Sequence, residues 1–231
     1  MGTATTSTPA EDTEVLQTVK LLKRQWLSEN AFEIELTRPA GFEYKAGHNI
    51  AFSYESEKRY YSLVSAPNDP TFSLCIHYVR EGHFSPILAA AEIGSHFNIT
   101  GPHGYFTFQP SVRQPVFVAT GTGIAPFVSM ARSGVTNFVL LHEANSSKEL
   151  YYHSYFREIT SNYFACLTQA ANSEDSPLDA YQGEISVCLQ KNLPPKSYDF
   201  YLCGHRKMIR EATLLVDEVY AGSRVYREVY F

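Results

Sequence analysis

The apolar positions of the chain follow two different patterns, one on each side of about residue 112. Up to residue 110, short runs alternate apolar with polar residues, are rich in β-branched and aromatic side chains, and are separated by turn residues roughly every 8–12 positions. This alternation is typical of strands that bury one face, and short strands at such even spacing predict an antiparallel β-barrel. The runs cover residues 14–27, 32–39, 48–55, 59–65, 72–79 and 96–102.

One helical segment is expected within this half, at residues 85–91, where a serine and a proline precede small and apolar residues. Serine is a preferred N-cap because its hydroxyl accepts a hydrogen bond from a free backbone N–H group, and proline suits the first helical position. The sequence therefore predicts Ser85 as the N-cap and Pro86 as the first helical residue.

Beyond residue 112 the pattern changes: continuous apolar runs, typical of strands buried on both faces, alternate with segments of helical periodicity. The strand runs lie at 116–120, 137–144, 162–170 and 198–204, and the helical stretches at 126–134, 148–160, 183–192 and 207–220. This alternation predicts an α/β domain, an open parallel sheet with helices on both faces. The expected fold is thus two-domain: a disordered tail at 1–12, an N-terminal antiparallel β-barrel at 13–112 and a C-terminal α/β domain at 113–231.

Composition narrows the function classes. The 231 residues are 44% apolar and 19% charged and carry a net charge of −5, so no basic stripe is available for nucleic acid. No apolar run reaches the roughly 20 residues of a membrane span, and the N-terminus lacks the features of a secretory signal. The four cysteines lie far apart without a CxxC pair, so no metal site and a reducing, cytoplasmic location are expected.

The first candidate site is an abrupt strand end. An apolar run breaks at Gly121-Thr122-Gly123, and Pro126 follows. Ligands of parallel α/β sheets bind at the carboxyl ends of strands, and glycines let a bulky group approach while the next helical turn offers N–H groups to phosphate. No Lys-Ser/Thr follows, so this is not a P-loop, and Pro126 breaks a GxGxxG pattern. A tight structural turn is the alternative interpretation.

Two further stretches carry candidate chemistry. In the run 59–62, Arg59 and Tyr61 share one face of a predicted strand, which suits a ligand with a phosphate and a flat ring. The alternative is an amphipathic strand with a solvated arginine. At 201–204 another apolar strand breaks at Gly204 and brings the thiol of Cys203 to the same sheet edge, unless that cysteine is simply a small buried residue.

These motifs, in this order, resemble the ferredoxin–NADP reductase family of flavoproteins, and the resemblance covers residues 14–231. Its segments are RYYSLVS, EGHFSPIL, GPHGYF, GTGIAPF and CGHRKM. It implies that FAD is held by Arg59 at the pyrophosphate, by Tyr61 and Ser62 at the isoalloxazine, and by neighbouring residues. The implied FAD contacts are Arg59, Tyr60, Tyr61, Ser62, His77, Val79, Gly82, His83, Phe84, Ser85 and Phe231. The implied nicotinamide-nucleotide contacts are Thr120, Gly121, Thr122, Gly123, Cys203, Gly204 and Met208.

The resemblance also places residues at the reacting centre. Ser62 and Cys203 would align donor and acceptor without acting as nucleophiles, and the ending REVYF resembles the aromatic C-terminus that covers the flavin in this family. Because Phe231 follows Tyr230, either ring can be the cover, and Glu228 lies beside them. His83, His103 and His205 each adjoin a glycine turn, and we expect structural or solvent-exposed roles for them.

The resemblance implies NADH or NADPH as the nucleotide donor. Relatives that use NADPH often carry Ser-Arg after the strand at 163–167, whereas this chain has Thr168-Gln169-Ala170 there and Glu184 where an arginine is common. A 2′-phosphate without a cationic partner is costly to desolvate, which favours NADH. Lys148 and Lys191 keep NADPH open.

The implied reaction is hydride transfer from the nicotinamide to flavin N5, followed by electron release. The chain lacks the Cys-x4-Cys-x2-Cys run of a fused ferredoxin, so the acceptor is expected to be separate: a ferredoxin, a flavodoxin or an oxygenase iron–sulfur component. A basic docking patch would support an acidic ferredoxin as the acceptor, but the candidate residues for such a patch are few: Lys20, Lys23, Arg24, Lys58 and Arg59. The alternatives are a reductase that uses free flavin as substrate and an FAD-holding electron-transfer subunit of a larger complex.

Overall fold

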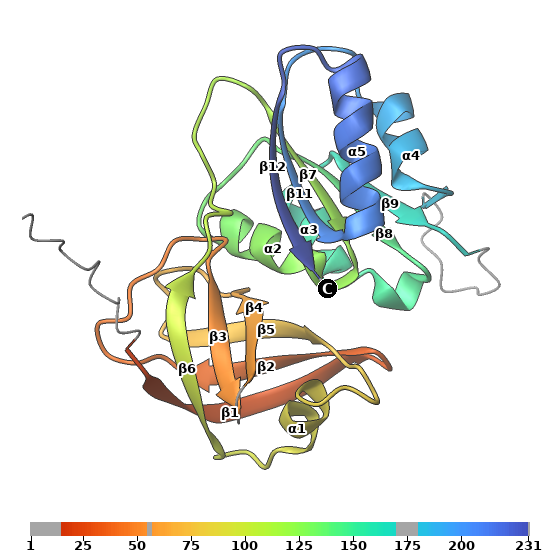
Figure 1. Cartoon of the computed structure of the whole chain (residues 1–231). Helices are drawn as coiled ribbons and strands as arrows, with labels where there is room; N and C mark the ends of the chain where they lie inside the picture. The colour runs from red at the N-terminus through yellow and green to blue at the C-terminus, as the bar shows by residue number, and fades with distance from the viewer. Residues whose placement is uncertain (1–14, 55–56, 170–179, 231) are drawn as a thin grey trace, which may run out of the picture.

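The computed structural model describes residues 15–54, 57–169 and 180–230 (Figure 1). The N-terminal half forms a six-stranded antiparallel sheet in the order β4-β3-β6-β1-β2-β5. Its strands are β1 (Gln17–Ser28), β2 (Ala31–Thr37), β3 (Asn49–Tyr54), β4 (Glu57–Ser62), β5 (Thr71–His77) and β6 (His96–His103).

The two outer strands of this sheet meet, so it closes on itself. Leu63, directly after β4, forms an antiparallel bridge with Leu74 of β5. The inward-facing residues of all strands make one apolar cluster that includes Val19, Ile34 and Phe52. Closure removes the free edges of the sheet and encloses this cluster. The predicted antiparallel β-barrel is confirmed.

Helix α1 (Ser85–Ala90) packs at one end of the barrel with Leu88 buried. The prediction that Ser85 is the N-cap is wrong: Phe84 occupies that position and Ser85 is already helical. The hydroxyl of Ser85 instead accepts a hydrogen bond from the Val79 N–H at 2.9 Å, because the preceding loop folds back onto it. At the C-terminal end of α1, the Arg24 guanidinium donates to the carbonyl of the C-cap residue Ala91 at 2.5 Å. This hydrogen bond satisfies a carbonyl that has no partner within the helix.

The C-terminal half is a six-stranded sheet in the order β10-β9-β8-β7-β11-β12, with every neighbouring pair parallel. All residues of the central strand β7 are buried, as expected for a strand covered on both faces. The strands are β7 (Pro115–Thr120), β8 (Val139–Ala144), β9 (Tyr163–Leu167), β10 (Tyr181–Gln182), β11 (Asp199–His205) and β12 (Arg224–Tyr230). The predicted α/β sheet is confirmed, whereas β10 and β12 were not predicted as strands.

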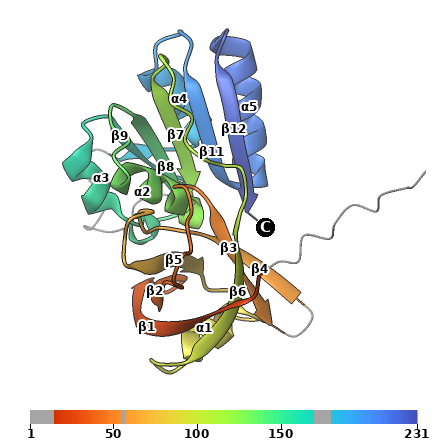
Figure 2. The same cartoon turned by 90° about the vertical axis from the view of Figure 1, so that its left-hand side faces the viewer.

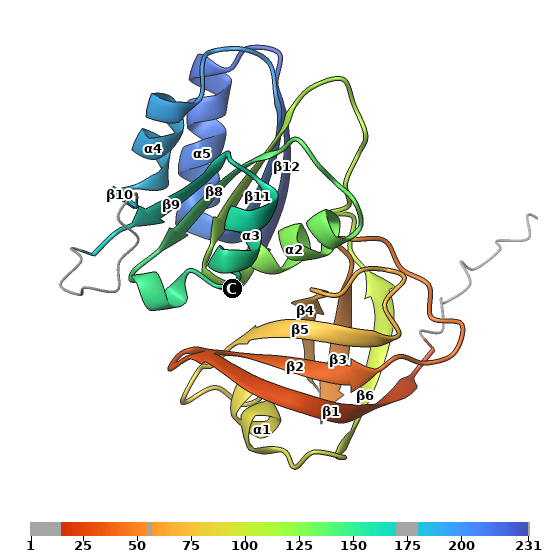
Figure 3. The same ribbon diagram turned by 180° about the vertical axis from the view of Figure 1, so that it is seen from behind.

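Helices cover both faces of this sheet (Figures 1 and 3). Helices α4 (Ile185–Asn192) and α5 (Arg206–Val219) pack on one face. On the other lie α2 (Ala125–Arg132), which follows the 3₁₀ turn η1 (Gly121–Ile124), and α3 (His153–Ile159), which follows the short turn η2 (Ser147–Glu149). None of the helices in the described part of the chain is long and apolar enough to cross a membrane.

The barrel and the parallel sheet share a core. Figures 1 and 2 show α2 between them, and one buried cluster joins Ala31 and Val64 of the barrel to Phe117, Phe127 and Tyr201 of the α/β half. Hydrogen bonds add to this packing, since the Ser129 hydroxyl on α2 donates to the Ser65 carbonyl at 2.6 Å. The division near residue 112 stays a prediction.

A second polar contact joins the halves on the α3 side, where the Tyr152 hydroxyl donates to Oε2 of Glu33 at 2.5 Å. We expect Tyr152→Phe to lower the free energy of unfolding by about 1–3 kcal/mol, because the carboxylate loses a donor in a partly buried place. Urea unfolding measures this change. Tyr155→Phe, in the helix α3 that Tyr152 precedes as N-cap, is the control, and equal stabilities for the two variants would contradict the expectation.

Candidate functional site

A chain of hydrogen bonds crosses from the α/β half to the barrel. The hydroxyl of Tyr230 donates to Oγ of Ser62 at 2.6 Å, and Ser62 Oγ donates to Oε2 of Glu228 at 3.3 Å. Glu228 and Tyr230 lie two residues apart in β12, so both side chains leave the same face of the strand. In Figure 1 the end of β12 points to the junction between the two halves.

The carboxyl of Glu228 is the most perturbed acid of this cluster. Burial raises its pKa to about 7, although hydrogen bonds from Asn49 and Ser62 act in the opposite direction. Asn49 donates through Nδ2 to Oε1 at 3.1 Å, so the two donors occupy different carboxyl oxygens. A carboxyl that titrates near neutrality can both take up and release a proton under physiological conditions.

Cys203 completes the cluster from β11. It is fully buried, and burial raises the pKa of its thiol well above the usual value, with a further increase from Glu228. Burial likewise raises the pKa of Tyr230 well above its usual value. Both groups are therefore neutral near pH 7, and Cys203 is not a thiolate nucleophile.

The barrel side of the site is a strip of aromatic rings ending in a cation. The strand register places Arg59 opposite Phe52 and Tyr61 opposite Ile50, so Arg59 and Tyr61 share a face as predicted. Tyr61 stacks on Phe84 with ring centroids 6.2 Å apart. Arg59 pairs with Glu57 at 2.6 Å, but both side chains are about half exposed, so water screens the pair and leaves the guanidinium open to exchange.

The segment before α1 is held by its own backbone. The Gly82 N–H donates to the Val79 carbonyl at 2.9 Å, and a Cβ at Gly82 would lie 3.0 Å from that oxygen, so the turn requires a small residue. His77 ends β5 and is exposed, as is His83. Tyr60 lies on the opposite face of β4 and meets His103 edge-on at 5.4 Å. The contact between Tyr61 and Phe84 thus brings the predicted segments 59–62 and 82–85 side by side.

The turn after β7 is open on its outer side. Gly121 has φ +53°, and an added Cβ would meet nothing within 4 Å. Gly123 is the opposite case, since a Cβ there would lie 2.4 Å from the Cys203 carbonyl oxygen. At Gly204 a Cβ would lie 2.0 Å from Oγ1 of Thr120, and that hydroxyl accepts the His205 N–H at 2.8 Å. Gly123, Thr120 and Gly204 therefore join the ends of β7 and β11, while Gly121 faces outward.

Thr122 lies in the same 3₁₀ turn and is partly exposed, whereas Met208 is buried in the first turn of α5. Met208 packs in the buried cluster beneath α5, and its contact with the nucleotide stays a prediction.

The edge beyond β8 and β9 carries paired charges. Glu143 accepts the Ile185 N–H at 2.9 Å, and burial raises its pKa. Lys207 pairs with Glu184 at 3.1 Å. Lys191 lies 4.7 Å from the centroid of the Tyr181 ring and donates to the Tyr181 hydroxyl at 3.4 Å. Lys207 and Lys191 are thus engaged, and Lys148 lies in η2 just after β8. Thr168 and Gln169 directly follow β9 (Tyr163–Leu167). Ala170 and Phe231 lie outside the described residues.

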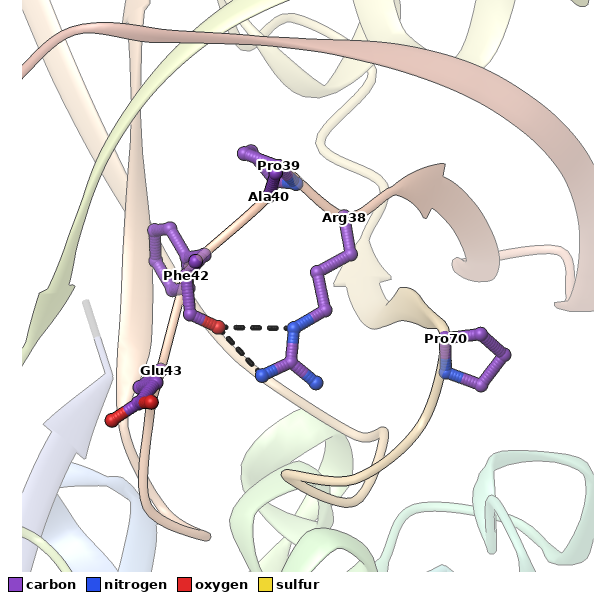
Figure 4. Close-up of a pocket in the computed structure, with 7 residues that line it drawn as sticks. Arg38, Pro39, Ala40, Phe42, Glu43 and Pro70 are labelled. Atoms are coloured by element: carbon purple, nitrogen blue, oxygen red, sulfur yellow. Dashed lines mark hydrogen bonds between the residues drawn. The ribbon is translucent and has the colours of Figure 1, made fainter.

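A surface pocket elsewhere on the barrel is unrelated to these groups. Figure 4 shows its lining, which consists of Arg38, Pro39, Ala40, Gly41, Phe42, Glu43 and Pro70. The Arg38 guanidinium donates to the carbonyls of Phe42 at 3.0 Å and Asp69 at 2.9 Å and also to that of Pro67. Arg38 therefore ties two loops together.

The residues at the junction fit a flavin dinucleotide. The exposed guanidinium of Arg59 suits a pyrophosphate, and the stacked rings of Tyr61 and Phe84 suit a flat ring. The turn at Gly121, which has open space on its outer side, suits a second nucleotide. Oδ1 of Asn49 is buried without a hydrogen-bond partner among the described residues, which indicates an acceptor available to a ligand. Sequence reasoning missed Asn49, and the only signal was a polar residue opening the apolar run 49–52.

Comparison with known proteins identifies both halves of the chain. Residues 18–108 match the family described as oxidoreductase FAD-binding domain, and residues 117–213 match oxidoreductase NAD-binding domain. The chain is 27% identical over 175 residues to the flavodoxin/ferredoxin–NADP reductase of Escherichia coli (strain K12), covering 68% of this chain and 71% of that protein. It is 44% identical over 80 residues to ferredoxin–NADP reductase B of Sorangium cellulosum, which spans 34% of this chain and only 33% of that relative.

A third relative is the glycine betaine monooxygenase reductase subunit of Pseudomonas aeruginosa, at 24% identity, with 100% of this chain and 68% of that protein covered. Among solved structures, the ferredoxin NADP+ reductase of Neisseria gonorrhoeae with bound FAD and NADP has a TM-score of 0.82 at 21% identity, covering 94% of this chain and 99% of that one. Its likeness shows the fold. With both domains matched in order, the chain belongs to the ferredoxin–NADP reductase-like family of oxidoreductases that bind FAD and a nicotinamide nucleotide.

Proposed function

We propose that this protein takes electrons from NADH, holds FAD as a bound group, and passes the electrons to a separate redox protein. The observation that carries the proposal is the hydrogen-bonded cluster of Ser62, Glu228 and Tyr230, which lies where the FAD-binding and NAD-binding halves meet. Bound FAD supplies hydride acceptance and release of single electrons.

Besides electron transfer, the reaction must also remove one proton in each turnover. NADH gives up a hydride, which is two electrons and a proton, and an iron–sulfur or similar carrier accepts electrons only. Each turnover therefore leaves one proton for the protein to remove. Glu228 takes this proton on its carboxyl group, and Ser62, bonded to Oε2, lies between Glu228 and the Tyr230 hydroxyl. Cys203, as a neutral thiol, positions the nicotinamide.

The remaining residues bind and orient the two nucleotides. Arg59 and the loop before α1 hold the FAD pyrophosphate, Tyr61 contacts the flavin ring, and the turn after β7 holds the dinucleotide. The proposed FAD contacts within the described residues are Arg59, Tyr60, Tyr61, Ser62, His77, Val79, Gly82, His83, Phe84 and Ser85, and Phe231, which lies outside them, stays a proposed contact. Thr120, Gly123 and Gly204 act by shaping the turn through the close contacts of their backbones and the Thr120 hydroxyl.

NADH is favoured over NADPH by the charges beyond β8. Glu143 and Glu184 place carboxylates at this edge, Lys207 is paired with Glu184, and Lys191 is engaged by Tyr181. A 2′-phosphate would meet negative groups there, and Lys207 or Lys191 would have to leave its partner to contact it, which leaves Lys148 of η2 as the remaining candidate cation. We therefore expect a KM for NADH roughly 10- to 100-fold below that for NADPH. Anaerobic titration of the flavin absorbance with each nucleotide measures this, and a preference for NADPH would refute the donor assignment alone.

The acceptor is tested with purified protein. A yellow protein that NADH bleaches, and that then reduces an added ferredoxin, flavodoxin or oxygenase iron–sulfur component, supports the proposal. Protein that purifies without FAD yet turns over free flavin would identify a flavin reductase instead. Protein that holds FAD, turns over slowly alone and copurifies with a partner would identify a subunit of a larger complex. A cytoplasmic location stays a prediction.

A further inference from the structure

Asn49 is a buried amide with one polar partner. Its side chain opens β3 and the residue is 7% exposed. Nδ2 donates to Oε1 of Glu228 at 3.1 Å, and Oδ1 is buried with no hydrogen-bond partner among the described residues. Because an ionised carboxylate only accepts hydrogen bonds, the amide must present Nδ2 to it. The contact with Glu228 therefore fixes the orientation of the Asn49 side chain.

The surrounding backbone makes room for this amide. Asn49 pairs with Ser62 of β4 on one side and with His103 of β6 on the other. At Gly104, directly after β6, an added Cβ would lie 2.8 Å from Nδ2 of Asn49 and 3.8 Å from Oε1 of Glu228. Three strands and a glycine turn thus converge on one hydrogen bond, which is more than a chance surface contact would require.

Two titratable side chains from neighbouring strands face Glu228, and both are neutral near pH 7. Cys203 on β11 and Tyr230 on β12 are titratable, and burial raises both pKa values well above their usual values. Ser62 on β4 donates to the other carboxyl oxygen. His103 is directed to Oγ1 of Thr100 at 2.9 Å. Donation by Asn49 and Ser62 is therefore what offsets the burial of the carboxylate.

We propose that Asn49 is a positioning residue for proton transfer: its amide holds Oε1 of Glu228, so that Oε2 stays turned to Ser62. This inference rests on the proposed function, in which Glu228 removes a proton in each turnover. An amide donor at Oε1 stabilises the ionised carboxyl, and its removal moves the pH range in which Glu228 can accept a proton upward.

The test compares Asn49→Leu with the wild type in FAD-loaded protein. Leucine is close to asparagine in size and cannot donate. A hydrogen bond to a charged group is worth enough to move the midpoint of the pH–rate profile for reduction of ferricyanide by about one pH unit upward. Asn98→Leu is the matched control, because Asn98 lies on the exposed side of β6 and bonds Thr18. Its profile should match that of the wild type.

A second measurement separates positioning from general damage. In ¹³C-glutamate-labelled protein, the carboxyl signal that Glu228→Gln removes is titrated directly by NMR, and Asn49→Leu should move its midpoint upward by the same amount. In the Glu228→Gln background, adding Asn49→Leu should change the pH profile no further. If Asn49→Leu fails to fold, Asn49→Asp serves, and its added carboxylate should give a larger upward shift.

An unchanged midpoint for Asn49→Leu, in both measurements, would overturn the inference. So would an equal shift in the Glu228→Gln background, because the effect would then not pass through Glu228. The proposed function fails separately: if wild-type protein with bound FAD does not reduce ferricyanide or an iron–sulfur carrier with NADH, the NMR titration still reports whether Asn49 controls the Glu228 carboxyl.

Discussion

Glu228→Gln is expected to slow reduction of an electron acceptor about 100-fold at pH 8, because general acid–base groups contribute at least that much when they are well placed. Glutamine keeps the size of the side chain and can still bond Asn49 and Ser62, but it cannot take up a proton. FAD content and the Kd for NADH should stay close to wild-type values. The measurement is steady-state ferricyanide reduction by NADH, with FAD content read from the visible spectrum.

The pH dependence sharpens this prediction. The pKa of Glu228 is about 7, and the proton acceptor is the ionised form, so wild-type turnover should rise as the pH is raised through 7 and level off above it. The variant should lose this rise. Glu184→Gln is the control, since that carboxylate is exposed and paired with Lys207. A variant of Glu228 with the wild-type rate and profile would remove the proton role from the mechanism.

Gly123→Ala is expected mainly to destabilise the fold, whereas Gly121→Ala is expected mainly to weaken NADH binding. At Gly123 the new methyl group would lie 2.4 Å from the Cys203 carbonyl oxygen and 2.8 Å from the Gly204 Cα, and neither is a movable side chain end. The ends of β7 and β11 must separate, so we expect a loss of roughly 3 kcal/mol in the free energy of unfolding. NADH binding should weaken with it.

At Gly121 the new methyl group meets no protein atom within 4 Å. The left-handed φ should cost about 1 kcal/mol, so most of the stability should remain. The methyl group projects from the open side of the turn, where the dinucleotide is proposed to bind, and the KM for NADH should rise at least about 10-fold. Thermal unfolding and NADH titration measure both effects. Gly121→Ala with an unchanged KM would place the dinucleotide elsewhere.

The parts of the fold that could be predicted are those with strong local patterns. The run Pro115–Thr120 is apolar at nearly every position because both faces of β7 are covered, and α5 places buried residues such as Met208, Ala212 and Leu215 on one face. The break at Gly121-Thr122-Gly123 was readable because two glycines interrupt the apolar run, and Gly121 serves a local need through its left-handed φ of +53°. Such signals depend on neighbours in the chain.

Long-range contacts could not be predicted in this way. The hydroxyl of Ser85 bonds Val79 because a loop folds back, and the pattern Ser-Pro alone predicts an N-cap. Strand β12 is an edge strand beside β11, its residues are partly or fully exposed, and its sequence RVYREVY lacks a regular apolar alternation, so its apolar signal is weak. Asn49 and Glu228 are 179 positions apart, and nothing near either residue indicates that they meet.

The continuous core described for α2 and the barrel has a thermodynamic consequence. Ala31 and Val64 lie in the same buried cluster as Phe127 and Tyr201, so neither half can unfold without exposing apolar surface of the other. We expect a single cooperative transition in calorimetry, with no intermediate in which one half is native. A chimera that exchanges either half with that of a relative would therefore have to carry the matching side of this cluster to fold.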